Sequence, residues 1–205
     1  MLKRELERLK DPIELVIFLD PQKDPDSFSV YEYLNVIATN YPKLHLKLIT
    51  KNVYPDLFEQ NQIKEVPTLL IEGSGIQYTG IPAGPEAMVF IQTLVMKSTA
   101  NSGIGEVISR ILASLTKNIR IRTIVTTQCT ICPLAVKIGN MLSIESTLNG
   151  NGKVAHEIIN ASEHETYVSN YDLSAVPLII INDEVAFNGI PDVDQYVRKI
   201  TELGK

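Results

Sequence analysis

Short apolar runs alternate with helix-like stretches along the first half of the chain. Ile13–Leu19 is a nearly continuous apolar run of strand length, whereas Leu44, Leu46 and Leu48 alternate with polar residues as in a half-buried strand. The further strands predicted in this half are Val66–Ile71 and Ile76–Thr79. Its predicted helices are Leu2–Leu9, Ser27–Asn40 and Asp56–Gln60.

The second half repeats this order of elements. Ile119–Thr126 is rich in β-branched residues and predicts a strand. Apolar residues then recur at helical spacing after Cys132. The remaining predicted strands are Lys153–Ile159, Val176–Ile181 and Val185–Asn188, and the remaining predicted helices are Ile104–Leu115 and Glu163–Asn170.

An internal repeat is visible in the sequence itself. Val66-Pro67-Thr68-Leu69-Leu70-Ile71 is followed by Gly80-Ile81-Pro82, and Val176-Pro177-Leu178-Ile179-Ile180-Ile181 is followed by Gly189-Ile190-Pro191. Such a repeat indicates two similar structural units. We therefore predict one unit over residues 1–99, a linker at 99–103, and a second unit over residues 104–205.

Each unit has the order helix, βαβ, helix, β-hairpin, helix. A βαβ crossover gives parallel strands, and the hairpin adds antiparallel strands. The predicted fold class is therefore α/β, with two tandem thioredoxin-like units, each a mixed sheet flanked by helices.

Composition and charge exclude several functions. Hydrophobic residues make up 44% and charged residues 21% of the 205 residues, which is typical of a soluble globular protein. The formal net charge of −5 lacks the basic footprint of a nucleic-acid binder. The longest apolar runs, such as Leu15–Leu19, are far shorter than the ~20 residues of a membrane helix. The N-terminus lacks the apolar region of a secretory signal. We expect a cytoplasmic protein without nucleic-acid or membrane partners; the oligomeric state is not readable.

Cys129 and Cys132 are the only cysteines of the chain. Cys129 follows a predicted strand, Cys132 opens the next helix, and Pro133 sits where a helix tolerates proline. The positive end of a helix dipole favours the thiolate, which is the nucleophile in disulfide exchange. The sequence therefore predicts a redox centre, with Cys129 as the exposed attacking thiol and Cys132 as the partly buried resolving thiol.

Pro177 begins a predicted buried strand, which is an unusual place for a residue that cannot donate a hydrogen bond. A cis bond between Val176 and Pro177 would account for it. In thioredoxin-like folds such a proline lies beside the CxxC loop, so we expect Val176 and Pro177 to bind an extended substrate strand. Val66-Pro67 repeats the feature in the first unit.

The motifs resemble those of the protein disulfide oxidoreductases of thermophilic archaea and bacteria, also called glutaredoxin-like proteins. The resemblance covers the chain and rests on Cys129-Thr130-Ile131-Cys132-Pro133-Leu134-Ala135-Val136, on Gly80-Ile81-Pro82-Ala83-Gly84 and on both Val-Pro sites. It implies exchange of protein disulfides in the cytosol, with a thioredoxin reductase-like flavoenzyme as partner. No cofactor is expected beyond the Cys129–Cys132 pair.

The chain departs from this family in its first unit. Many members carry a CxxC in each unit, but the matching loop here, Asp20–Ser27, has no cysteine, and Asp24 and Ser27 fall near the expected positions. We therefore expect a redox-silent first unit. Neither a metal nor a catalytic histidine is expected, because zinc needs about four ligands and His156 and His164 lack zinc-finger spacing.

Three functions remain open from the sequence. The first is a thiol–disulfide oxidoreductase that acts on protein disulfides through Cys129 and Cys132. The second is an electron carrier between a flavoenzyme and a peroxiredoxin. The third belongs to another class, a chaperone or adaptor that binds peptides and uses its thiols only secondarily.

Overall fold

The computed structural model of the protein describes residues 2–205. In the first half the helices are α1 (Leu2–Leu6), α2 (Phe28–Thr39), α3 (Pro55–Gln60) and α4 (Glu86–Ser98). The strands of this half are β1 (Ile13–Leu19), β2 (Leu44–Thr50), β3 (Thr68–Ile71) and β4 (Ile76–Thr79). This order agrees with the order predicted from the sequence.

The second half repeats the same order. Its helices are α5 (Glu106–Ala113), α6 (Cys132–Asn149), α7 (Glu165–Val168) and α8 (Val193–Gly204). Its strands are β5 (Ile119–Val125), β6 (Val154–Asn160), β7 (Leu178–Ile181) and β8 (Glu184–Asn188). The helix α7 is shorter than predicted, because Asn160 O accepts the amides of both Glu163 and His164 in a turn before it.

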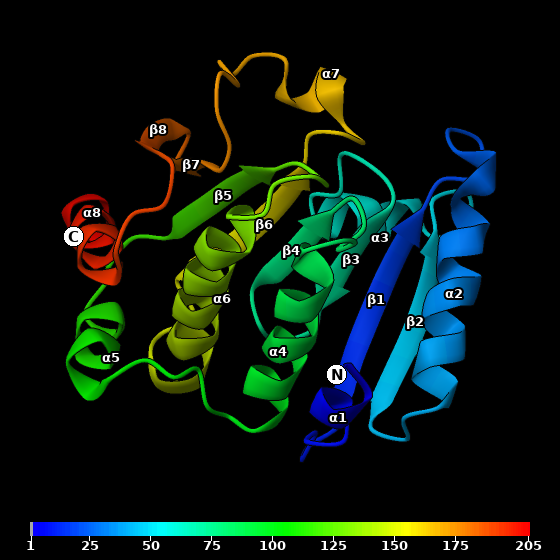
Figure 1. Cartoon of the computed structure of the whole chain (residues 1–205), viewed down its shortest axis with the longest axis horizontal. Helices are drawn as coiled ribbons and strands as arrows, with labels where there is room; N and C mark the ends of the chain where they lie inside the picture. The colour runs from blue at the N-terminus through cyan, green and yellow to red at the C-terminus, as the bar shows by residue number, and fades with distance from the viewer. Residues whose placement is uncertain (1) are drawn as a thin grey trace.

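All eight strands form one mixed sheet, in the order β2-β1-β3-β4-β6-β5-β7-β8. Within each half the parallel βαβ pair lies beside an antiparallel hairpin, so the predicted α/β class with thioredoxin-like topology is confirmed. The halves are joined by parallel pairing of β4 with β6. Figure 1 shows α4 and α6 side by side over this junction.

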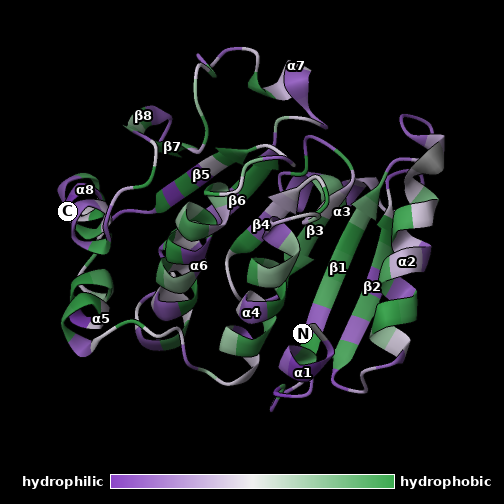
Figure 2. Ribbon diagram, in the orientation of Figure 1, coloured by the Kyte–Doolittle hydropathy of each residue, from purple (hydrophilic) through white to green (hydrophobic). Residues whose placement is uncertain are grey.

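Alternating residues of each strand pack on opposite faces of the sheet. Leu15 and Ile17 of β1 join the large core beneath α2 and α4, whereas Val16 and Phe18 pack with Phe58 of α3 on the other face. Figure 2 shows β1 as almost continuously hydrophobic and β2, at the sheet edge, as alternating. None of the helices in residues 2–205 has the length and apolarity that a membrane span requires.

Polar side chains link the two halves inside the core. Asn140 of α6 donates to Tyr78 of β4 at 2.9 Å, and its amide oxygen lies 2.8 Å from Nδ1 of His156. His156 Nε2 lies 2.8 Å from the Thr123 hydroxyl, and burial lowers the pKa of His156 to about 3. The imidazole is therefore a neutral group inside the core.

Candidate functional site

Four loops and both Val-Pro segments lie at one edge of the sheet. Strands β1, β4, β5 and β6 run in the same direction, so the loops after their last residues lie at the upper edge in Figure 1. The loop after β5 carries Cys129 and leads to Cys132 at the start of α6, and the loop after β4 carries the Gly80-Ile81-Pro82-Ala83-Gly84 motif. Both Val66–Pro67 and Val176–Pro177 are cis, which confirms the expectation from the sequence.

Cys129 and Cys132 are joined by a disulfide, with their Cα atoms 5.5 Å apart. Cys132 is the first residue of α6 and is completely buried, where it packs in the core with Val125 and Val136. Cys129 precedes the helix and is half-buried. Only Cys129 is therefore accessible to another molecule.

The backbone around Cys129 can stabilise negative charge on its sulfur. The amide of Cys132 donates to the Cys129 sulfur at 3.1 Å, and this amide belongs to the first turn of α6. The residue before the helix is Ile131, which offers no capping oxygen, so the helix dipole faces the sulfur without competition. These are the conditions that favour a thiolate when the disulfide is reduced.

The segment before cis-Pro177 lies against the same sulfur. The carbonyl oxygen of Val176 is 4.0 Å from Cys129 Sγ, and Val176 is half-buried. The exposed apolar side chains of Ile131 and Leu134 flank the cysteines on the helix side. The four residues predicted as site residues are thus brought together, although their roles in binding and catalysis stay predictions.

The Gly80–Gly84 loop of the first half packs against the cysteine loop. Gly84 has a φ of +58°, and a Cβ there would approach the carbonyl oxygen of Thr127 to 3.1 Å. The other side of this loop is held by the second half, because Glu163 accepts the amide of Ile81 at 3.2 Å. The position of this motif in the structure therefore depends on both halves.

Glu86 is a candidate functional residue that the sequence did not indicate. It is 4% exposed, and within residues 2–205 neither of its carboxylate oxygens has a hydrogen-bond partner. Burial raises the pKa of Glu86 to about 7. A cavity of about 10 Å³, about the room for one water molecule, is lined by Glu86 and by Thr126 and Thr127 of the cysteine loop. The only signal in the sequence is a glutamate at a helix start, which is too common to be informative.

The cysteine-free loop of the first half is tied to Glu65 by an ion pair from Lys23. Lys23 lies 2.5 Å from Glu65, which in turn lies 3.7 Å from His164 Nδ1 of the second half. Glu65 immediately precedes Val66 and cis-Pro67. A charged residue that makes an ion pair therefore directly precedes the segment that corresponds to Val176–Pro177. No thiol occupies this loop, as expected.

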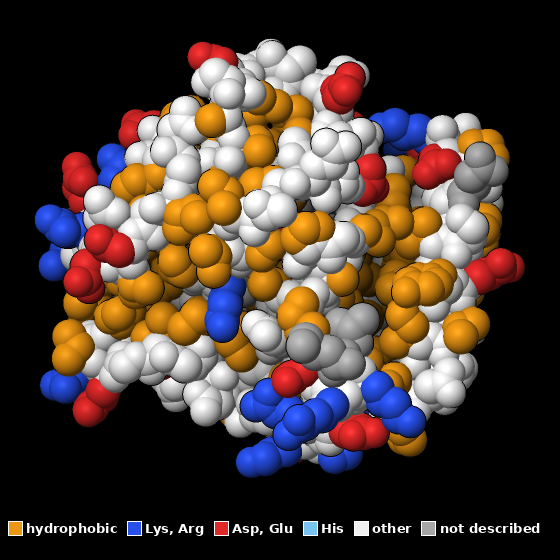
Figure 3. Space-filling view, in the orientation of Figure 1, with side chains coloured by type: hydrophobic (Ala, Val, Ile, Leu, Met, Phe, Trp, Pro, Cys, Tyr) orange, Lys and Arg blue, Asp and Glu red, His pale blue; other side chains and the backbone are white. Residues whose placement is uncertain are grey.

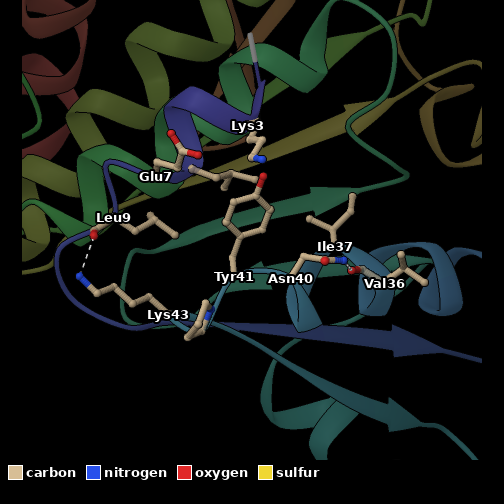
Figure 4. Close-up of a pocket in the computed structure, with 10 residues that line it drawn as sticks. Lys3, Glu7, Leu9, Val36, Ile37, Asn40, Tyr41 and Lys43 are labelled. Carbon is tan, nitrogen blue, oxygen red and sulfur yellow. Dashed lines mark hydrogen bonds between the residues drawn. The ribbon is translucent and has the colours of Figure 1, made fainter.

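A larger cavity lies away from the cysteines. A cavity of about 640 Å³ opens between α1 and α2, where Tyr41 and Ile37 face Lys3 and Glu7 (Figure 4). It lies at the end of the molecule opposite the cysteine loop, and lysine and arginine side chains gather around that end (Figure 3). Within the described chain no group of three or more His, Cys, Asp or Glu residues is arranged to hold a metal ion.

Comparisons with known proteins agree with this geometry. A family model described as a thioredoxin domain matches residues 118–202. A protein disulfide oxidoreductase from Aeropyrum pernix K1 superposes with a TM-score of 0.91 at 26% identity, covering 99% of this chain and 90% of the other. The NTD_N/C domain of alkylhydroperoxide reductase AhpF from Enterococcus faecalis (V583) gives 0.84 at 21% identity, covering 97% and 95%.

A curated relative is much longer than this chain. It is named NADH dehydrogenase, comes from Bacillus subtilis (strain 168), and is 21% identical over 97% of this chain. The chain spans only 37% of that relative's length. The resemblance expected from the motifs is confirmed: residues 118–202 match a thioredoxin domain model, and the whole chain closely matches the structure of an archaeal protein disulfide oxidoreductase.

Proposed function

We propose that the protein is a thiol–disulfide oxidoreductase that acts on protein disulfides through the single Cys129–Cys132 centre. The asymmetry of the two sulfurs carries this proposal. Cys129 is accessible at a helix N-terminus beside the Val176 carbonyl, whereas Cys132 is completely buried. Such a pair can bind one partner at a time and then release it.

In the reductive direction, the Cys129 thiolate attacks one sulfur of the substrate disulfide. A Cys129–substrate disulfide forms, and the second substrate sulfur leaves as a thiolate that takes up a proton. The Cys132 thiol then loses its proton and attacks Cys129, which releases the second substrate thiol. The substrate gains two electrons and two protons, and the Cys129–Cys132 disulfide is restored.

Glu86 is a titratable group close to the cysteine loop, across a small cavity that Thr126 and Thr127 also line. A carboxyl group with a pKa of about 7 exchanges a proton readily near neutral pH. The disulfide itself is the redox group in this proposal, which requires no bound cofactor.

A reductase must regenerate the dithiol. We assign this step to a thioredoxin reductase-like flavoenzyme in the cytoplasm. The similarity to part of a longer protein named NADH dehydrogenase and to a domain of AhpF supports a redox partner of this kind. The AhpF similarity also supports a second candidate, in which the protein carries electrons from such a flavoenzyme to a peroxiredoxin.

The test is reduction of insulin disulfides by the wild type and by Cys129→Ser, Cys132→Ser and the double variant. We expect turnover only in the wild type, and a stable mixed disulfide with insulin only in Cys132→Ser, because Cys129 can attack but nothing resolves the product. A reduction potential of about −270 mV would favour a reductase, whereas a potential of about −180 mV would favour a disulfide-forming oxidase. If the double variant keeps full activity in suppressing aggregation while the wild type shows no exchange, the protein is a chaperone or adaptor instead.

A further inference from the structure

A buried arginine holds the segment that leads into Val176. Arg122 of β5 is 9% exposed, and its Nη1 donates to the hydroxyl of Tyr171 at 2.8 Å. Its Nη2 pairs with Asp183 in the turn between β7 and β8. The guanidinium also lies 5.9 Å from the centroid of the Tyr171 ring. One side chain therefore connects a central strand, a hairpin turn and the loop after α7.

This loop has few other attachments. Residues 169–177 connect α7 to β7, and the ring of Tyr171 and the side chain of Leu173 pack on the core beneath them. Within the described chain, no main-chain hydrogen bond joins residues 172–176 to a helix or strand. The hydrogen bond from Arg122 is thus a principal polar restraint on the course of the chain into Val176.

The redox-silent half lacks this arrangement. Strands β1 and β5 are equal in length, and Val16 occupies the position in β1 that Arg122 occupies in β5. The two residues also pair with matching residues of the following hairpins, Leu70 and Ile180. Val16 packs in an apolar cluster with Phe58. The buried arginine therefore occurs only beside the cis-proline that faces the cysteines.

Burying an arginine is unfavourable unless its donors are satisfied. Nε of Arg122 has no partner within residues 2–205, so the arrangement is already incomplete. Valine at the matching position shows that the topology itself does not require a charged residue there. The free-energy cost of burying Arg122 occurs only in the half that carries the cysteines. This indicates that the arginine serves a function in that half.

We propose that Arg122 and Tyr171 are positioning residues that hold the Val176–Pro177 edge for polypeptide substrates. This inference rests on the proposed function. Val176 offers main-chain groups to an extended chain, and its carbonyl lies 4.0 Å from the sulfur that reacts. A small disulfide reaches Cys129 without using that edge. Arg122 and Tyr171 therefore affect the binding of a polypeptide substrate and leave the reaction at the sulfurs unchanged.

The test compares Tyr171→Phe with the wild type and with Tyr33→Phe. Tyr171→Phe removes only the hydroxyl that Arg122 binds, and Tyr33 is 67% exposed on α2, far from the site. Each protein is assayed with insulin and with 5,5′-dithiobis(2-nitrobenzoic acid), and the reduction potential is measured. For Tyr171→Phe we expect KM for insulin to rise about five-fold, as loss of one ordinary hydrogen bond predicts. Its kcat, the rate with the small disulfide and the potential should stay unchanged, and Tyr33→Phe should match the wild type.

Hydrogen–deuterium exchange of residues 169–177 provides a second readout that does not depend on activity. We expect faster exchange in Tyr171→Phe than in either other protein. An unchanged KM for insulin, or an equal loss with both disulfides together with a shifted potential, would overturn the positioning role. A wild type that reduces neither disulfide contradicts the proposed function. Faster exchange in that case would leave the pair as a structural restraint and overturn its role in substrate binding.

Discussion

At the scale of single residues, burial gives chemically identical groups different properties. Cys129 and Cys132 carry the same thiol, yet one is half-buried at a helix N-terminus and the other is completely buried. Glu86 differs in the same way from exposed glutamates such as Glu59. Desolvation disfavours its charged form, because no neighbour among the described residues offers a hydrogen bond.

Glu86 should make stability depend on pH. Its pKa is raised from 4.5 to about 7, so the folded state binds the proton more tightly than the unfolded state. The stabilisation is complete below about pH 4.5 and is lost as the pH rises through 7. Glu86→Gln removes the ionisable group. We expect its free energy of unfolding, relative to the wild type, to increase between pH 5 and pH 8 by on the order of 2–3 kcal/mol.

Urea unfolding at the two pH values measures this difference. Glu59→Gln is the matched control and should show no such increase, because Glu59 is exposed in α3. A difference that stays constant between pH 5 and pH 8 would mean that Glu86 is already ionised in the folded protein.

At the scale of elements, helix α6 is fixed by close contact with β6. Gly139 lies directly over the imidazole of His156, and a Cβ at Gly139 would come within 2.4 Å of His156 Cε1. The ring cannot move aside easily, since both its nitrogens are held by Thr123 and Asn140. The same helix carries Cys132 at its N-terminus, so this packing also sets the position of the redox centre.

Gly139→Ala tests the contact between α6 and β6. Alanine favours a helix over glycine by about 1 kcal/mol, but overpacking a tight core costs about 1–3 kcal/mol. Because the backbone and ring are both held, we expect net destabilisation, measured as a lower urea midpoint. Gly105→Ala is the control, since nothing lies within 4 Å of the added Cβ, and its midpoint should change little. A stabilised Gly139→Ala would show that the His156 ring can be displaced.

At the scale of the whole molecule, the two halves share a core. The largest cluster of buried residues includes Ile17 and Leu94 from the first half and Val125, Val136 and Ile158 from the second. The sheet continues through the parallel pair β4–β6. A core that spans both halves couples their unfolding, although the repeated sequence would suit two independent domains.

We therefore predict a single cooperative unfolding transition. Leu94→Ala removes a fully buried side chain in the first half and should cost about 2–5 kcal/mol. Circular dichroism and tyrosine fluorescence should report the same lowered midpoint, because tyrosines occur in both halves and the chain has no tryptophan. Two separate transitions, of which only one shifts, would mean that the halves unfold independently.

Much of the fold was readable from the sequence because its information is local. Alternation in Leu44–Thr50, the apolar run Ile13–Leu19 and the repeated Val-Pro and Gly-Ile-Pro motifs depend on neighbours a few residues apart. Cys129 and Cys132 were identifiable for the same reason, since their spacing and Pro133 define a helix start.

Long-range contacts decided the rest. Three features depend on residues that lie far apart in the chain. They are the pairing of β4 with β6, the burial of Glu86 and the hydrogen bond from Arg122 to Tyr171. Local patterns cannot indicate such contacts, because a glutamate at a helix start or an arginine in a strand is ordinarily solvated. The sequence alone determined the order of elements and the pairing of Cys129 with Cys132 at a helix start. The tertiary structure alone decided which polar groups lose water around them, and desolvation is what alters their chemistry.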